Sequence, residues 1–185
     1  MKATYKAGRP LTEDELNEIA FAPIRKKENE TYYYLVGMLA VVWAHVEVCL
    51  DLLNVIILHE ATTKETQLPS LLGRKIKFLR KHFQNIPELI SLRDDALGLF
   101  DKVDQLKEVR HDIIHGTAEA RLPEGERKII RNDYRGMKLV ERHKIYSLRE
   151  ITVATEAMTD LAGLLIILGR ATMKAFKDKK NNTLG

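Results

Sequence analysis

The stretch that decides the fold is ETYYYLVGMLAVVWAHVEVCLDLLNVIILH, residues Glu30–His59. Its apolar residues fall on almost every side of a helix with 3.6 residues per turn, so we expect one long helix that packs against neighbours on several sides. Its unbroken apolar or weakly polar part, Tyr32–Ala44, is shorter than the roughly twenty residues that a membrane-spanning helix needs. Because Glu47 and Asp51 follow soon after, the sequence predicts a core helix of a soluble protein and no membrane association.

Further helices are expected on both sides of this stretch. Thr12 and Glu15 have the spacing of a capping box, which predicts a short helix at about Leu11–Phe21. Ser147 and Glu150 have the same spacing before the last apolar run. The expected later helices are Ser70–Gln84, Glu88–His115 with Gly116 as the residue that ends it, and Leu148–Lys177, followed by a frayed polar tail, Asp178–Gly185.

The helical period is lost between Gly116 and Ser147, where turn signals separate stretches of β-compatible residues. The expected strands are Thr117–Leu122, Lys128–Tyr134 and Lys138–Tyr146. The predicted fold class is therefore all-α: an antiparallel four-helix bundle with a short N-terminal helix and an inserted β hairpin or three-stranded meander at about 117–146. We expect an N-terminal arm over 1–29, a helical bundle over 30–177 and a flexible tail over 178–185.

Composition narrows the class of protein. The chain has 185 residues, of which 45% are apolar and 30% are charged, and its net charge is +4. These values exclude a disordered chain and permit nucleic acid as a partner. The single cysteine, Cys49, cannot form an internal disulfide, and Met1–Pro10 has no apolar core of a secretory signal, so we expect a cytoplasmic protein. No phosphate-binding or dinucleotide-binding glycine motif is present, and we expect no cofactor.

The sharpest local pattern is RHDIIH, residues Arg110–His115. On a helical wheel Arg110 falls inside an apolar sector, whereas His111 and His115 lie together just beyond its edge. A guanidinium turned toward a core or an interface needs an anionic partner. That partner is either a carboxylate of the long helix, from Glu47 or Asp51, or a phosphate of a ligand, and the sequence leaves both open.

The pattern resembles the R-x4-H motif of the HEPN superfamily, whose members are helical bundles with the motif late in a long helix. The stretch around Trp43–Glu47 is similar to the first core helix of bacterial members. The resemblance implies a metal-independent endoribonuclease in which the RNA 2′-OH attacks the neighbouring phosphate, at a composite site between two copies of the chain, in toxin–antitoxin, phage-defence or stress systems. It implies Arg110 and His115 as the main catalytic pair, His111 as a polar assistant, and Glu47 as a weaker catalytic candidate. It also implies RNA, a second copy and an antitoxin or other protein as partners. The alternative is a non-catalytic helical interaction module with a structural Arg110, because some members have lost catalysis.

A second reading of the same residues is a metal site, since His111 and His115 have the spacing of a zinc-binding helix. No clear third ligand follows them, and His143 in the expected hairpin is not compelling. We therefore expect no metal.

The helix expected at Ser70–Gln84 carries five cations and no acid. Its candidate RNA-binding residues are Arg74, Lys77 and Lys81 on one face, with Arg80 at the edge of that face. The alternative is an ordinary solvated face. Trp43 and Tyr32–Tyr34 could stack on bases, but their helical spacing within an apolar run favours a place in the core.

Overall fold

The computed structural model describes residues 5–6, 9–10, 12–15, 27–61, 67–119, 126–135 and 138–183. In these ranges the chain is mainly helical and carries a small three-stranded antiparallel sheet. The mainly helical class that the sequence predicts is confirmed, and so is the three-stranded form of its β insertion.

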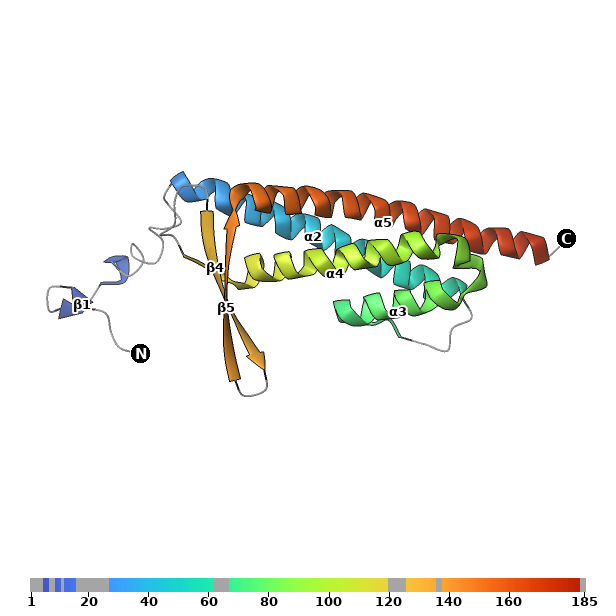
Figure 1. Ribbon diagram of the computed structural model, residues 1–185, viewed down its shortest axis with the longest axis horizontal. Coiled ribbons are helices and arrows are strands. Elements are labelled where there is room, and N and C mark those ends of the chain that lie inside the picture. Colours follow the sequence, from blue (N-terminus) through green and yellow to red (C-terminus); the bar gives the residue numbers. More distant parts are fainter. Residues whose placement is uncertain are drawn as a thin grey trace.

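Two long helices form the centre of the molecule. Helix α2 (Lys27–Glu60) contains the whole predicted helix Glu30–His59, and it lies beside α5 (Leu148–Thr183) along most of its length (Figure 1). The core is built where they meet, with Leu50 and Leu53 of α2 and Leu161 of α5 among its fully buried side chains. Trp43, Tyr32 and Cys49 are buried as predicted, but Tyr33 and Tyr34 of the same run are exposed.

Two further helices pack on this centre. Helix α3 (Leu72–Asn85) and helix α4 (Arg93–His115) are joined by a 3-10 helix, η1 (Pro87–Leu92), and Phe83 meets Phe100 edge-to-face at 5.7 Å between ring centres. The predicted continuous helix Glu88–His115 is therefore wrong in its first residues. Proline restricts the residue before it to extended backbone, and Ile86 has φ −86° and ψ 117°, so the chain turns sharply and restarts as a 3-10 helix.

The sheet has the strand order β3 (Thr117–Glu119), β4 (Glu126–Arg135) and β5 (Lys138–Ser147). It lies across the end of the helices at which α4 finishes, and β4 and β5 extend away from them as a hairpin (Figure 1). Residues opposite one another on neighbouring strands share a face, and Ile129 stands opposite both Ala118 and Lys144. Because Ile129, Arg131 and Tyr146 are buried, this face of the sheet is the one that packs against the helices.

The start of α5 follows a local sequence signal, and its end does not. Ser147 and Glu150 form the predicted capping box in front of α5, with the Ser147 backbone N–H donating to Glu150 Oε2 over 2.7 Å. Helix α5 then continues to Thr183, so the predicted end at Lys177 is wrong, and residues 178–183 of the predicted flexible tail are helical. The ion pair between Lys179 Nζ and Glu88 Oε1 of η1, at 2.5 Å, holds this last part of α5 against the body.

The N-terminal region is described only in pieces. Thr12 and Glu15 form the predicted capping box, in which the Thr12 backbone N–H donates to Glu15 Oε2 over 3.0 Å, and residues 13–15 are helical. The rest of the predicted helix Leu11–Phe21 lies outside the described residues. A short antiparallel pair that the sequence did not predict, β1 (Tyr5–Lys6) with β2 (Arg9–Pro10), precedes it.

Both central helices also have the length and apolar composition of a membrane span, over Asn29–Glu60 and Leu148–Lys179. The sequence predicted no such span, because its two unbroken apolar runs, Tyr32–Ala44 and Leu161–Gly169, are each too short by themselves. Core helices of soluble proteins have the same properties, and 44% of each apolar window is buried inside the molecule.

Gly116 joins α4 to β3 at a point where there is no room for a side chain. Its backbone is extended (φ −86°, ψ 157°), so the left-handed conformation common at helix ends is not the reason for glycine here. A Cβ at this position would overlap the side chain of Ile129 and the carbonyl oxygen of Asp112. Glycine therefore allows β4 to approach the last turn of α4.

We expect Gly116→Ala to destabilise the fold by about 1–3 kcal/mol, the usual cost of overpacking a core. This corresponds to a fall in melting temperature of roughly 2–12 °C for a domain of this size. Gly98→Ala in the exposed interior of α4 is the matched control, since a Cβ there meets nothing within 4 Å and alanine favours helix. A thermal melt of both variants checks this, and equal melting temperatures would contradict the close approach.

Candidate functional site

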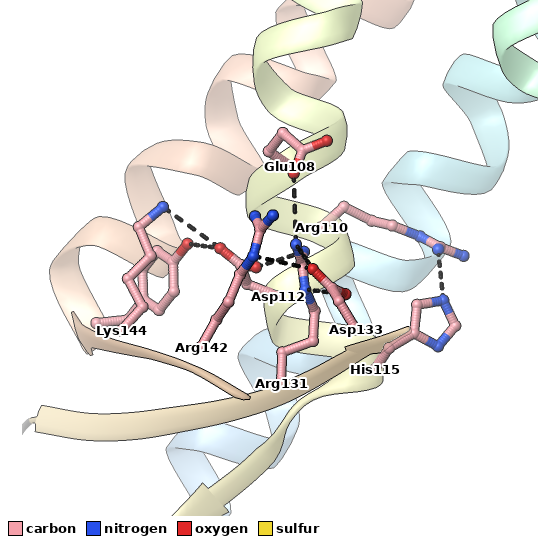
Figure 2. A network of polar contacts seen from close by, with 9 residues as sticks. Glu108, Arg110, Asp112, His115, Arg131, Asp133, Arg142 and Lys144 are labelled. Carbon is pink, nitrogen blue, oxygen red and sulfur yellow. Dashed lines mark hydrogen bonds and ion pairs between the residues drawn. The ribbon is translucent and has the colours of Figure 1, made fainter. Parts of the chain in front are cut away.

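The RHDIIH residues form the last turns of α4, next to the face of the sheet that packs against the helices (Figure 2). Arg110 Nη1 lies 2.8 Å from His115 Nε2. A guanidinium can only donate a hydrogen bond, so His115 Nε2 must accept it, and the imidazole is neutral with its proton on Nδ1. The structure thus joins the two residues that the sequence predicts as the main pair.

The carboxylate partners that the sequence offered for Arg110 are engaged elsewhere. Glu47 Oε1 accepts a hydrogen bond from Trp43 Nε1 at 2.5 Å within α2, and Asp51 pairs with Lys75 Nζ of α3 at 2.6 Å. Of the two kinds of partner that the sequence left open for Arg110, a carboxylate from Glu47 or Asp51 is therefore not the one found. In the described part of the chain Arg110 forms no ion pair with a carboxylate, and its buried Nε has no hydrogen-bond partner. The guanidinium keeps its capacity to bind an anion.

Two imidazoles stand side by side at this helix end. The ring centres of His111 and His115 are 4.8 Å apart. Desolvation by the surrounding protein, followed by the positive charges of Arg110, His111 and Arg131, lowers the pKa of His115 from its ordinary value. The lowered pKa and the hydrogen bond from Arg110 both favour the neutral ring, which is the form that can accept a proton near neutral pH.

The residue between the two histidines holds the helix end on the sheet. Asp112 is buried, and its Oδ1 lies 2.6 Å from Arg131 Nη1 of β4. Its Oδ2 accepts a hydrogen bond from the Tyr146 hydroxyl over 2.7 Å and faces Lys144 Nζ at 3.3 Å, both from β5 (Figure 2). One carboxylate thus contacts three side chains from two strands.

Arg131 is the centre of this polar network and is only 5% exposed. Its Nε lies 3.0 Å from Asp133 Oδ1, and Asp133 Oδ2 is in turn 3.0 Å from Arg142 Nε of β5. Burial works against the charge of Arg131, but its contacts with Asp133 and Asp112 outweigh burial and raise the pKa of the guanidinium. The hydrogen bond from Arg131 lowers the pKa of Asp133, so this pair stays charged.

Sequence reasoning missed the pairing of Asp112 with Arg131, because it considered Asp112 only as a stand-in for the glutamate of a zinc-binding helix. A signal was present. Arg127, Ile129 and Arg131 alternate along one strand, and residues two apart point to the same face. If Ile129 faces the core, both arginines do as well, and buried arginines need acidic partners.

The cationic helix α3 is only partly available to a ligand. Arg80 Nη2 pairs with Asp101 at 2.8 Å and with Asp104 at 3.2 Å, so it serves the packing of α3 on α4. Lys81, Arg74 and Lys77 are exposed. Arg80 contacts Asp104 of α4, whereas Phe83, later in α3, contacts Phe100, earlier in α4, so the two helices are antiparallel. Arg74 and Lys77 therefore lie toward the end of α4 that bears RHDIIH.

Within the described ranges, no group of three or more His, Cys, Asp or Glu side chains is arranged to hold a metal ion. His143, the weak third-ligand candidate, contacts Glu141 on its own strand, with 2.6 Å between Nε2 and Oε1.

No family model, curated protein or solved structure matches the chain in the three comparisons made.

We expect Asp112→Asn to destabilise the protein by about 3–5 kcal/mol, because it removes one charge of a buried ion pair and strands Arg131. The melting temperature should fall by roughly 6–20 °C. Asp101→Asn is the matched control: it breaks an exposed ion pair with Arg80, which is worth about 1 kcal/mol or less. Similar melting temperatures for the two variants would show that the Asp112 network does not hold α4 on the sheet.

Proposed function

We propose that this protein is a metal-independent endoribonuclease that cleaves RNA by attack of a 2′-OH on the neighbouring phosphate. The observation that carries the proposal is the pairing of a guanidinium that has no carboxylate partner among the described residues with a neutral imidazole, Arg110 with His115. A guanidinium without a carboxylate partner suits a phosphate, and a neutral imidazole suits proton abstraction.

In the proposed reaction Arg110 moves its hydrogen bond from His115 Nε2 to the phosphate oxygens, where negative charge builds up. His115 Nε2 is then free to take the proton of the 2′-OH, and the 2′ oxygen forms a bond to phosphorus. The bond from phosphorus to the 5′ oxygen breaks as a second histidine, His111 or one from the facing copy of the motif, gives that oxygen the proton that its own imidazolium ring carries. The products are a 2′,3′-cyclic phosphate and a 5′-hydroxyl. Glu47 has no part in this scheme, because its carboxylate is held by Trp43.

The wider biological role rests on the resemblance of RHDIIH to the HEPN motif. From this resemblance we propose that the helices form a bundle of HEPN type. We also propose that the protein acts in the cytoplasm in a toxin, defence or stress response, with an antitoxin or another protein as its partner. Arg74 and Lys77, exposed on the part of α3 that faces the motif end of α4, are the proposed contacts to the RNA backbone.

We expect the wild-type protein to cleave mixed RNA in EDTA and to leave 2′,3′-cyclic phosphate or 3′-phosphate ends. Arg110→Met should lower the rate on the order of 10²–10³, the usual cost of losing one charge-stabilising donor. Its melting temperature should hold, since no carboxylate loses a partner. Arg93→Met at the start of α4 removes an exposed guanidinium paired with Asp94, and it should leave cleavage unchanged. Cleavage assays and thermal melts on the same preparations check this.

Activity that EDTA abolishes and Mg²⁺ or Zn²⁺ restores would contradict metal independence. A protein that cuts no RNA, together with a large loss of stability in Arg110→Met, would favour the alternative of a non-catalytic interaction module with a structural arginine.

The composite site requires a second copy, and α2 offers a surface for one. One set of exposed side chains on α2 is spaced alternately by four and three residues, which is the spacing with which helices pack on each other. The set is apolar or aromatic except for His45. We call this set the α2 seam: Tyr34, Met38, Val41, His45, Val48 and Leu52. The buried residues of α2 that meet α5 occupy the opposite side, so the seam has no partner among the described residues. Symmetric pairing is the commonest assembly, so we propose that a second copy covers it.

We expect light scattering to give the mass of a dimer at micromolar concentration. Val41→Glu should shift it to the mass of a monomer, because a charge would lie in an apolar contact. Leu71→Glu, at another exposed leucine outside the seam, should remain dimeric. A monomeric wild-type protein would rule out the composite site.

A further inference from the structure

A pocket of about 500 Å³ lies beside the RHDIIH residues, where the last turns of α4 meet the inner face of β4 and β5. It is lined by Glu108, Asp112, Ile129, Arg131, Arg142, His143 and Lys144. This volume falls within the range of small-molecule sites in proteins. The proposed reaction does not use the pocket.

Two of the lining residues, Asp112 and Arg131, form a buried ion pair with each other. The other charged lining groups are more exposed and reach toward the pocket, although Arg142 also pairs with Asp133, and Lys144 with Asp112. Glu108 contributes a carboxylate from α4 that is 56% exposed, and its ion-pair partner among the described residues is Arg131, at 3.7 Å. Arg142 and Lys144 contribute donors from β5 and are 43% and 56% exposed. Acceptors therefore stand on the helix side of the pocket and donors on the strand side (Figure 2).

This arrangement suits a neutral ligand better than an anion. A phosphate that approached Arg142 and Lys144 would also meet the carboxylates of Glu108 and Asp112. A nucleobase is neutral and carries donors and acceptors on different edges. Guanine is the base whose Watson–Crick edge offers two adjacent N–H donors, which a carboxylate can accept together. Its O6 and N7 are acceptors that arginine and lysine bind.

The pocket adjoins the proposed reaction site. Asp112, which lines the pocket, belongs to the same RHDIIH segment at the end of α4 as Arg110 and His115, and the charge of Arg131, another lining residue, acts on the His115 ring. We infer that this pocket binds a guanine base of the RNA next to the cleaved phosphate, with Glu108 accepting from N1–H and the 2-amino group, and Arg142 and Lys144 donating to O6 and N7. This inference rests on the proposed function, because it assigns the base preference of that site.

The test uses 2′-O-methyl oligonucleotides, which have no 2′-OH to attack and so report binding without cleavage. Uridine octamers with one central guanine, inosine or adenine are compared by fluorescence anisotropy. Guanine should bind roughly 5- to 150-fold more tightly than adenine, the range of one good bidentate contact. Inosine, which lacks the 2-amino group, should lie between them. The unmethylated guanine octamer should be cut next to its guanine.

Glu108→Gln should lower the ratio of guanine to adenine affinity by about tenfold or more, since an amide offers one acceptor where the carboxylate offers two. Glu156→Gln on the exposed face of α5 is the matched control and should keep the wild-type ratio. A thermal melt confirms that both variants fold. Arg142→Met, which removes a donor from the opposite wall, should lower the same ratio.

The two proposals fail in different ways. Cleavage without a preference for guanine would overturn the pocket and leave the nuclease standing. Guanine-selective binding that depends on Glu108, in a protein that cuts no RNA, would support the pocket and overturn the nuclease. Equal affinity for all three octamers would overturn the pocket whether or not RNA is cut.

Discussion

The buried ion pair between Asp112 and Arg131 is the constraint on which the rest of the site depends. Taking two charges out of water is costly, and such a pair persists only when further contacts satisfy the remaining oxygens and N–H groups. Tyr146 and Lys144 satisfy Asp112, and Asp133 adds a second carboxylate to Arg131. Since these contacts come from two strands, they fix both the position of the sheet and the rotation of the last turn of α4. The β insertion is thus part of the site.

Fixing that rotation explains why Arg110 has no carboxylate partner among the described residues. Residues two apart on a helix differ by about 200° around its axis, so when Asp112 turns into the sheet, Arg110 turns away from it. Asp112 and Asp133 satisfy Arg131 and not Arg110. The buried carboxylate of Asp112 and the guanidinium of Arg110, which meets His115 and no described carboxylate, are therefore consequences of one packing arrangement. The lowered pKa of His115 follows in part from the same arrangement, because it brings Arg131 close to the ring.

The features that the sequence predicted correctly are those with local causes: the capping boxes, the long α2 and the period-two strands of the meander. The errors have tertiary causes. The sequence left a pairing of Arg110 with Glu47 open, and it could not show that Trp43, one helical turn away, holds that carboxylate. Arg80, a predicted RNA contact, pairs instead with Asp101 and Asp104 of α4. The added turn at the end of α5 contacts η1 through Lys179 and Glu88, a pair that no local pattern encodes. The proximity of Arg110 and His115 could be predicted from the sequence because both residues lie within one helical segment.

Helices α2 and α3 show why apolar patterning carries information about assembly as well as about the fold. Helix α3 is amphipathic and buries one face, as expected for a helix with neighbours on one side. Helix α2 is apolar on nearly all sides, yet the body covers only the side that includes Leu39, Leu50 and Leu53. A helix needs an apolar surface only where it packs. The α2 seam lies opposite the core face and has coiled-coil spacing, which supports the proposal that a second copy of the chain packs on it. The property that made α2 decisive for the fold is then the same one that favours a composite site between two copies.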